Sequence, residues 1–446
     1  MGRRTAWRRY GGGRPSAPLR AVFGRAAVVG AVLCLTAAVS GPSARAADPW
    51  AAYGFDADAQ SVDGATNTGD AEALAPGTTY RSSLPVDGER AYRLDLDASS
   101  DVYVSVTAVP GAGTTVSATD GIKVSVQDAD SRSCSIDTAS IGTDRRPRPL
   151  TALGTRDTSS RPGARCQEAG AYYVRVERVH RAGSSSDVWG LELAVVSEPG
   201  LQQTGGTSAP EVWDSAAPEP VTGEAEERPG ASGFAGATTV GQGVWRDDIL
   251  PGQTLFYAVP VDWGRQLYAT AELGSSGDAD GLVARALVVS LHNPVRGIVD
   301  DASAVYDGSQ RAATLDPLPP VSYVNRYAVS DRVSGMRFAG SYYLAVRLSE
   351  QVADKFGEGP YDLTLRVRVT GTATAAPAYA GEPEPQGVFD ATARGGETAA
   401  AAQAGTAAQD DTAMRLLAAG GMGMGTALLM GLAVWMVLGR RRDAAR

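Results

Sequence analysis

Residues that could carry acid–base chemistry are few in this sequence. It contains two histidines, His180 and His292, among 446 residues. His180 follows the strand-like sequence YYVRV and precedes a Gly/Ser turn, which predicts an exposed side chain. His292 ends the sequence VVSL, where an earlier, similar sequence ends at Gln127, and this favours a polar cap at a strand end over a general base. Because the sequence has no GxSxG, HExxH or CxxC motif and no phosphate-binding glycine loop, we predict no catalytic residue and no enzyme.

Acidic and aromatic side chains offer two kinds of binding chemistry. Loop carboxylates can donate oxygens to calcium, and the candidates are Asp278, Asp280, Asp300 and Asp301. Aromatic rings on strands can stack against sugars, and the candidates are Trp263, Tyr268, Tyr342 and Tyr343. Aspartate is also a common turn residue and strand aromatics commonly pack in a core, so we favour these structural interpretations. We predict no cofactor, and calcium stays the weaker alternative.

The three cysteines bear on the redox compartment. Cys34 lies in an apolar run near the N-terminus that we expect to be removed with a signal peptide. Cys134 and Cys166 then remain, an even number in an exported chain, and we predict a disulfide between them. Such a bond would close a 32-residue excursion and hold the polar, Pro/Arg-rich loop 145–165. A redox-active pair is disfavoured because it usually has CxxC spacing.

An internal duplication supplies the elements that position these residues. The sequence LPVDGERAYRLDLDASSDVYVSV (84–106) matches LPGQTLFYAVPVDWGRQLYATAEL (250–273) at an offset of 165 residues, which places Tyr92 on Tyr257 and Tyr103 on Tyr268. The same offset relates VSV (124–126) to VSL (289–291). Further on, AYYV matches SYYL and WGLELAV matches YDLTLRV. The offset between the copies changes here, because the intervening loops differ in length. We infer that one folding unit has been copied.

Apolar and polar residues alternate in the repeated sequences, which is the pattern of half-buried antiparallel strands. The strands predicted in the two copies cover residues 92–97, 102–106, 122–126, 173–177 and 191–195, and then 256–261, 266–272, 286–291, 342–348 and 361–369. Between residues 48 and 372 the only helical pattern is one or two turns at 350–356. We therefore predict an all-β fold of two tandem antiparallel β-sandwich (jelly-roll-like) domains plus one C-terminal transmembrane helix.

Specific phrases in both copies resemble a known family. The turn PVDGERAYRLDL, the strand GAYYVRV and the closing strand WGLEL resemble the pre-peptidase C-terminal β-sandwich of bacteria, present twice. The phrases ILPGQTLFYAVPVDWGRQL, LHNPVRG and RFAGSYYLAVRL resemble the stalk region of actinobacterial surface proteins that also carry a von Willebrand factor A domain. That A domain itself is absent, because its metal-binding DxSxS motif is only approximated at Asp97–Asp101. The resemblance implies a secreted, membrane-tethered pair of sandwiches.

Signals for export and anchoring stand at the two ends. A basic region, the apolar run 26–39 and the small residues Ala44 and Ala46 predict a signal peptide cleaved after Ala46. Residues 416–438 carry no charge and are long enough to cross a bilayer. Arg440, Arg441 and Arg442 follow at once and predict a cytoplasmic C-terminus, hence a single-pass type I protein of the cell membrane with extracellular domains.

The charged residues are unevenly distributed along the sequence. The formal charge is −9, yet the first 46 residues carry eight arginines and no acid and the last eight carry +3, so the portion between is strongly acidic. This charge excludes nucleic acid as a partner.

The predicted segments are a signal peptide 1–46, a flexible N-terminal segment 47–72, sandwich 73–198, flexible linker 199–233, sandwich 234–372, disordered stalk 373–413, transmembrane helix 414–438 and tail 439–446.

The function predicted from the sequence is that of a membrane-anchored extracellular protein whose tandem sandwiches form a binding or structural module. Its partner, a protein or a glycan, is not identified by the sequence. The first alternative is an accessory subunit that docks a surface enzyme or a secretion partner. A secreted hydrolase is the second alternative, and it would require a cleft that brings His292 to an acid and a hydroxyl.

Overall fold

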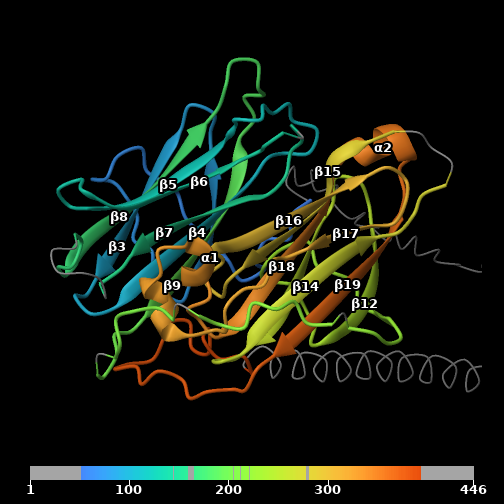
Figure 1. Cartoon of the computed structure of the whole chain (residues 1–446). Coiled ribbons are helices and arrows are strands. Elements are labelled where there is room, and N and C mark those ends of the chain that lie inside the picture. The colour runs from blue at the N-terminus through green and yellow to red at the C-terminus, as the bar shows by residue number, and fades with distance from the viewer. Residues whose placement is uncertain are drawn as a thin grey trace, which may run out of the picture. The chain divides into compact units, whose positions relative to one another are not determined.

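The computed structural model describes residues 52–143, 145–158, 165–203, 205–210, 212–219, 221–277 and 281–392. Their regular secondary structure is mostly antiparallel β-strand, as the alternation predicted (Figure 1). The predicted signal peptide, its cleavage site at Ala46, the span 414–438 and the arginines of the tail lie outside the described residues. Among the described residues, no helix is long and apolar enough to cross a membrane.

The first copy is a sandwich of two sheets, which we call sheet A and sheet B. Sheet A has the strand order β1-β2-β9-β4-β7 and sheet B the order β3-β8-β5-β6. The strands are β1 (Gln60–Ser61), β2 (Thr79–Leu84), β3 (Glu89–Leu96), β4 (Asp101–Val109), β5 (Gly121–Asp128), β6 (Ser133–Ser140), β7 (Leu150–Arg156), β8 (Gly170–Val179) and β9 (Trp189–Glu198).

The second copy also has two sheets, sheet D and sheet E. Sheet D has the order β10-β12-β19-β14-β17 and sheet E the order β11-β13-β18-β15-β16. The strands are β10 (Glu226–Glu227), β11 (Thr238–Thr239), β12 (Gly243–Ile249), β13 (Thr254–Val261), β14 (Gln266–Leu273), β15 (Val283–His292), β16 (Ile298–Tyr306), β17 (Arg311–Thr314), β18 (Gly340–Leu348) and β19 (Tyr361–Thr370). Short helices η1 (Tyr323–Tyr327), α1 (Asp331–Ser334) and α2 (Gln351–Phe356) complete it.

Corresponding strands occupy corresponding places in the two copies, which confirms the tandem organisation. The order β2-β9-β4-β7 in sheet A matches β12-β19-β14-β17 in sheet D, and β3-β8-β5-β6 in sheet B matches β13-β18-β15-β16 in sheet E. Eight strands in two Greek-key sheets form a jelly roll. Side-chain details repeat as well, since Tyr172 and Tyr342 each donate a hydrogen bond to the main-chain oxygen four residues earlier.

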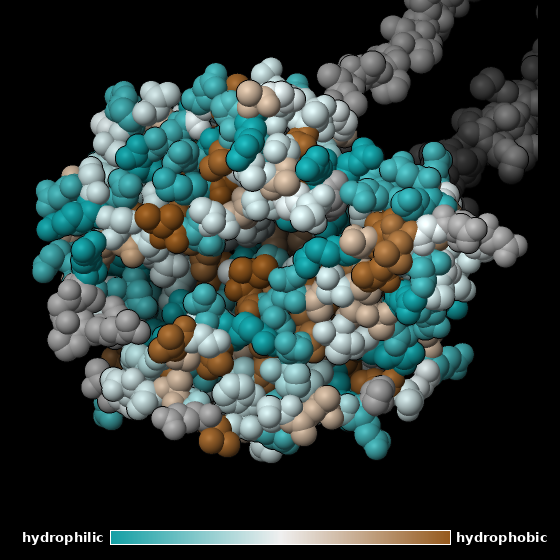
Figure 2. Space-filling view, turned by 45° about the horizontal axis from the view of Figure 1, so that its top comes forward, coloured by the Kyte–Doolittle hydropathy of each residue, from teal (hydrophilic) through white to brown (hydrophobic). Residues whose placement is uncertain are grey.

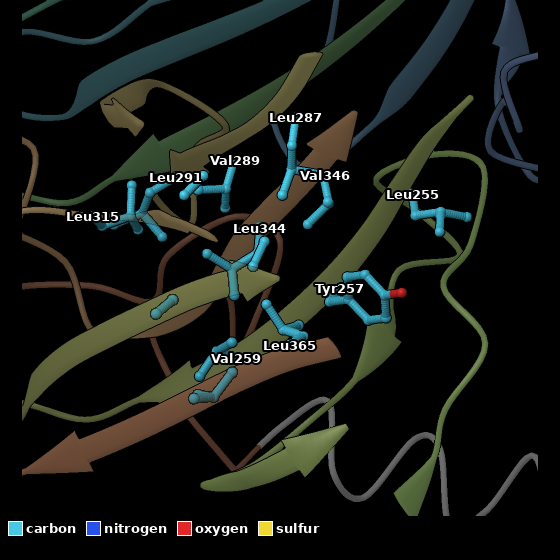
Figure 3. Close-up of a cluster of buried hydrophobic side chains, with 14 of the residues drawn as sticks. Leu255, Tyr257, Val259, Leu287, Val289, Leu291, Leu315, Leu344, Val346 and Leu365 are labelled. Atoms are coloured by element: carbon cyan, nitrogen blue, oxygen red, sulfur yellow. The ribbon is translucent and has the colours of Figure 1, made fainter. Parts of the chain in front are cut away.

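Each sandwich has its own core. In the second copy, inward-facing side chains of β13, β15 and β18 meet those of sheet D, as the labelled residues of Figure 3 show. Tyr257 lies at the edge of this core, where its hydroxyl donates to Asp247 Oδ2 at 2.7 Å. Its counterpart Tyr92 donates its hydroxyl to Ser82 at 2.8 Å. In each copy, the acceptor of this tyrosine hydroxyl is therefore a side chain of the same strand, β2 or its equivalent β12.

Sheet A and sheet E are packed against each other on their outer faces, and we call this interface the seam. Every residue of β4 is buried, and so are nearly all residues of β9, β13 and β18, which is possible only when both faces of a strand are covered. Two apolar clusters lie in the seam. One is centred on Phe234, Phe256 and Tyr343, and the other on Tyr103 and Phe338.

Covered and open faces differ in sequence at equivalent positions of the two copies. Outward-facing Ala258 and Ala345 of sheet E are buried in the seam, whereas their counterparts in sheet B are Arg93 and Arg175. Ala194 of sheet A corresponds in the same way to Arg366 of sheet D. Small apolar residues therefore line the faces that meet, and arginines line the equivalent faces that do not. The seam is a sequence-specified interface.

Three segments predicted to be flexible or disordered are hydrogen bonded in the structure. In the N-terminal segment, Tyr53 is buried and β1 pairs with β2. In the linker, β10 pairs with β12, and Gly230 N donates to Asp247 Oδ2 at 2.7 Å. Their composition is typical of flexible chain, but each finds main-chain partners at a sheet edge.

The described part of the predicted stalk, residues 373–392, also differs from the prediction. Ser197 and Glu384 exchange two main-chain hydrogen bonds, and Ala380 N donates to Gly200 O at 2.7 Å. Phe389 stacks on Phe338 with ring centroids 5.0 Å apart. A Cβ on Gly340 would lie 2.3 Å from Val388 O, so only glycine lets the chain pass this closely. We call residues 373–392 the strap, because it holds the start of the linker and one end of the seam.

Candidate functional site

Buried charges gather at one end of the seam around Arg326 of η1. Its Nη1 donates to Asp101 Oδ2 at 3.0 Å and its Nη2 donates to Glu198 Oε1 at 2.5 Å. The Arg326 side chain is 1% exposed. The hydroxyl of Tyr103 donates to the other oxygen of Glu198, and the hydroxyl of Tyr379 from the strap donates to Glu198 Oε1. This cluster joins β4 and β9 of the first copy, η1 of the second copy and the strap.

A second buried ion pair lies at the other side of the seam. Arg296 Nη1 donates to Glu192 Oε1 at 2.7 Å, and the Glu192 side chain is fully buried. Tyr53 donates its hydroxyl to the same oxygen at 2.9 Å. The guanidinium of Arg296 lies over the ring of Phe234 at 5.2 Å. Removing a charge from water is costly unless it is paired and hydrogen bonded, and both conditions hold here only because the two sandwiches are in contact.

His292 is at the end of β15 beside this pair, and His180 is exposed. The His292 ring packs edge-on against Phe234 and its Nδ1 lies 3.1 Å from the main-chain oxygen of Arg296. Because a carbonyl can only accept, Nδ1 carries the proton, and the side chain caps the turn after β15 as predicted. Burial lowers the pKa of His292 to about 4. His180 Nε2 is 3.7 Å from Asp87 Oδ1 at the surface.

The pKa shifts of Asp101 and His292 predict opposite pH dependences. Burial, with the nearby charges of Asp157 and Glu198, raises the pKa of Asp101 to about 6. Its stabilising contribution is therefore complete at low pH and is lost as the pH rises through 6. The lowered pKa of His292 gives a contribution that is present above pH 6.5 and is lost as the pH falls toward 4.

Single substitutions should separate these effects. Between pH 6.5 and 4.5, we expect Asp101→Asn to lose about 2 kcal/mol of unfolding free energy relative to wild type, and His292→Gln to gain about 2 kcal/mol. Glutamine is the residue at the equivalent position of the first copy, Gln127. Urea unfolding at several pH values measures the differences. Parallel pH profiles for the two variants and wild type would contradict this interpretation.

The Cys134–Cys166 disulfide is present, as predicted. The excursion that it closes differs from the prediction, because it contains most of β6 and all of β7 in place of a single long loop. Sequence reasoning missed Arg156 at the end of β7. This arginine is buried and its guanidinium donates to the main-chain oxygens of Cys166, Ser100 and Asp97. It thereby fixes the loop that carries Cys166 against the turn before β4.

Of the candidate calcium ligands, the structure describes only Asp300 and Asp301, and these two do not converge on one site. Asp300 and Asp301 are neighbours in β16, so their side chains point to opposite faces. Asp300 pairs with Arg332 and Asp301 pairs with Arg285. Asp278 and Asp280 lie outside the described residues, and within the described ranges no group of three or more His, Cys, Asp or Glu could hold a metal ion.

The candidate sugar-stacking residues are mostly covered. Trp263 and Tyr342 belong to the core of the second copy, and Tyr343 packs in the seam. Tyr268 is partly exposed on sheet D, where burial raises its pKa. The four rings therefore do not form one surface, and the core interpretation is confirmed for Trp263 and Tyr342. The surface seen in Figure 2 is mostly hydrophilic, with hydrophobic residues in small separate groups.

At least three hollows in the described part of the chain are formed jointly by the two copies, one of which, of about 260 Å³, is lined by Ser290, His292 and Asp301. A cavity of about 430 Å³ lies in the seam, and we call it the seam cavity; its walls come from β4, β9, the turn after β15, β18 and the strap. A groove of about 720 Å³ lies between the loop ends of the two sandwiches, and we call it the loop groove. It is lined by Arg145, Arg146 and Arg148 of the first copy and by α2 of the second. Arg146 crosses it to pair with Glu350 and Asp354.

Comparison with known proteins gives no family assignment. No family model and no curated protein matches the chain. The chain is similar to the CUB1-EGF-CUB2 domain of human MASP-1/3, at 9% identity over 65% of this chain and 99% of that one, with a TM-score of 0.17. It is also similar to the CBM22-1-CBM22-2 tandem domain of Paenibacillus barcinonensis Xyn10C, at 9% identity over 64% of this chain and 83% of that one, with a TM-score of 0.19.

A third similar structure is the ANXUR2 extracellular domain from Arabidopsis thaliana, at 9% identity over 66% of this chain and 85% of that one, with a TM-score of 0.16. Likenesses at these scores assign no activity. The resemblance to pre-peptidase C-terminal domains and to von Willebrand-type stalks is not supported by any family match.

Proposed function

We propose that this chain is an exported surface protein, anchored by one membrane span, whose two sandwiches form a single rigid binding or structural module outside the cell. The seam is the observation that supports this proposal. Two buried ion pairs and two apolar clusters fix one sandwich against the other, so surfaces from both copies keep a constant relation to each other. A module of this kind presents a ligand surface without needing a catalytic centre.

Two further features support an extracellular location. The disulfide fits an oxidising compartment. The sequence supplies a signal-like N-terminus and the uncharged run 416–438 followed by three arginines. In the sequence, the strap lies between the second sandwich and this uncharged run.

Protease treatment of intact cells tests the location. We expect a protease to release a fragment containing both sandwiches and to leave the C-terminal tail with the cells, because only the tail should be shielded. The same treatment after permeabilisation is the control. A fragment that appears only after permeabilisation would contradict the proposal.

The loop groove favours one alternative, an accessory protein that docks a surface partner. Its walls combine loops from both copies, and its volume is within the range of ligand-binding clefts. Cross-linking of intact cells through a photoreactive residue at position 145, which is exposed beside this groove, would capture such a partner. The matched control is the same photoreactive residue at position 93, on the open face of sheet B.

A further inference from the structure

The charges of the residues that line the seam cavity indicate the chemical class of its ligand. Three aspartates line it, Asp56, Asp58 and Asp390, and they come from the N-terminal segment and from the strap. The cationic lining residue Arg296 is neutralised by Glu192. The lining is therefore acidic, and so is the long-range field of the chain between its two basic ends. Both effects favour a cation.

A buried hydroxyl without a hydrogen-bond partner belongs to a residue that lines the same cavity. Ser105 of β4 lies among the lining residues and is 1% exposed. Within the described part of the chain, its Oγ has no hydrogen-bond partner. A buried polar atom without a partner costs about 1–3 kcal/mol, so a native structure usually satisfies it. The equivalent residue of the second copy, Thr270, has its hydroxyl 3.1 Å from that of Thr314, so the two copies differ at this position.

The lining also includes groups that suit a small polar molecule with an aliphatic part. Val196 and Val295 supply apolar walls, while Tyr343 and Ser341 add hydroxyl groups. The volume of about 430 Å³ is large enough for a side chain or a small molecule, and too small for a folded partner. An ammonium group is a compact cation with three donors, which matches an unsatisfied hydroxyl and carboxylates.

We propose that the seam cavity binds a primary alkylammonium group, with Ser105 Oγ and the carboxylates of Asp58 and Asp390 as its acceptors. The group could belong to a free amine or to a lysine side chain of a partner protein, since both present the same chemistry. This inference rests on the proposed function as a binding module and adds its ligand class. Because two copies and the strap line the cavity, occupancy would also hold the seam closed.

Calorimetric titration of the full-length protein in detergent tests the proposal. The probes are cadaverine as the free amine, acetyl-Gly-Lys-Gly-amide as the peptide, and 1,5-pentanediol as the neutral analogue. We expect saturable one-to-one binding of at least one ammonium probe, weakened by salt, and no binding of the diol. A higher affinity for cadaverine would identify a small-molecule ligand, and a higher affinity for the peptide would identify a protein side chain.

Matched variants assign the binding to the cavity. Ser105→Ala should weaken binding about tenfold to a hundredfold, the value of one hydrogen bond to a charged group, and Asp58→Asn with Asp390→Asn should weaken it by at least tenfold. Thr270→Ala, at the equivalent position outside the cavity, should leave the affinity unchanged. Equal binding of the diol, no effect of the cavity variants, or no heat with any probe would overturn the proposal. None of these outcomes affects the protease test of location.

Discussion

Replacing Arg326 by alanine is expected to lower the free energy of unfolding by about 3–5 kcal/mol, because it leaves Asp101 and Glu198 buried without their cation. The Arg326 guanidinium also lies 3.7 Å from the centroid of the Tyr323 ring, and this contact is lost with it. Urea-induced unfolding, followed by the fluorescence of the buried tryptophans, measures the change.

Arg332 provides the control. It lies six residues further along the chain and also contacts two aspartates, Asp300 and Asp316, but its side chain is 40% exposed. Its pair with Asp316 is exposed and Asp300 is only partly buried, so Arg332→Ala should cost about 1 kcal/mol, well below the effect at Arg326. Equal effects of the two substitutions would show that the Arg326 cluster is not buried in solution, and the seam would lose its main polar support.

Removing the Cys134–Cys166 disulfide by double substitution to alanine should cost about 4 kcal/mol, the loop-entropy value for a 32-residue separation. The loss should fall mainly on the first sandwich, because both cysteines pack against its core. Thermal unfolding of the oxidised protein, the reduced protein and the double variant measures it. A transition that is unchanged by reduction would contradict this expectation.

The duplication and the strands were predictable because they leave periodic signals in the sequence. The match of Tyr92 to Tyr257 places β3 on β13, and the structure has these strands at equivalent positions of their sheets. The strands β2, β6, β7, β12, β16 and β17, and the two-residue strands β1, β10 and β11, were not predicted. Their sequences, such as SCSIDTAS and LTALGTR, mix small and polar residues and have weak strand propensity, and tertiary contacts decide their conformation.

The seam was not predicted, although the sequence holds a signal for it. A strand covered on both faces can lose its alternation, as LFYAVPV of β13 does, whereas DVYVSVTAV of β4 keeps Ser105 and Thr107 at outward-facing positions. Comparing the two copies gives a stronger signal, since Ala258 and Ala345 correspond to Arg93 and Arg175. Glu192 and Glu198 look like ordinary outward-facing acids of β9, because their arginines lie more than a hundred residues away in the second copy.

The seam cavity could not be predicted from the sequence either, for a similar reason. Ser105 is one small residue within an apolar strand, and the aspartates around it come from segments that composition alone assigns to flexible chain. Only the docking of the N-terminal segment and the strap brings them to the same place. Interfaces between copies depend on which faces meet, and no periodicity within a single strand records that choice.

The proposed function depends most on the two sandwiches forming one rigid body. The most direct test is a distance measurement by electron spin resonance between labels at Arg93→Cys in sheet B and Asp362→Cys in sheet D, both of which are exposed and far from the seam. We predict a single narrow distance distribution that broadens when Arg326 is also replaced by alanine. A broad distribution in the otherwise unchanged protein would show that the sandwiches move independently and would contradict the proposed function.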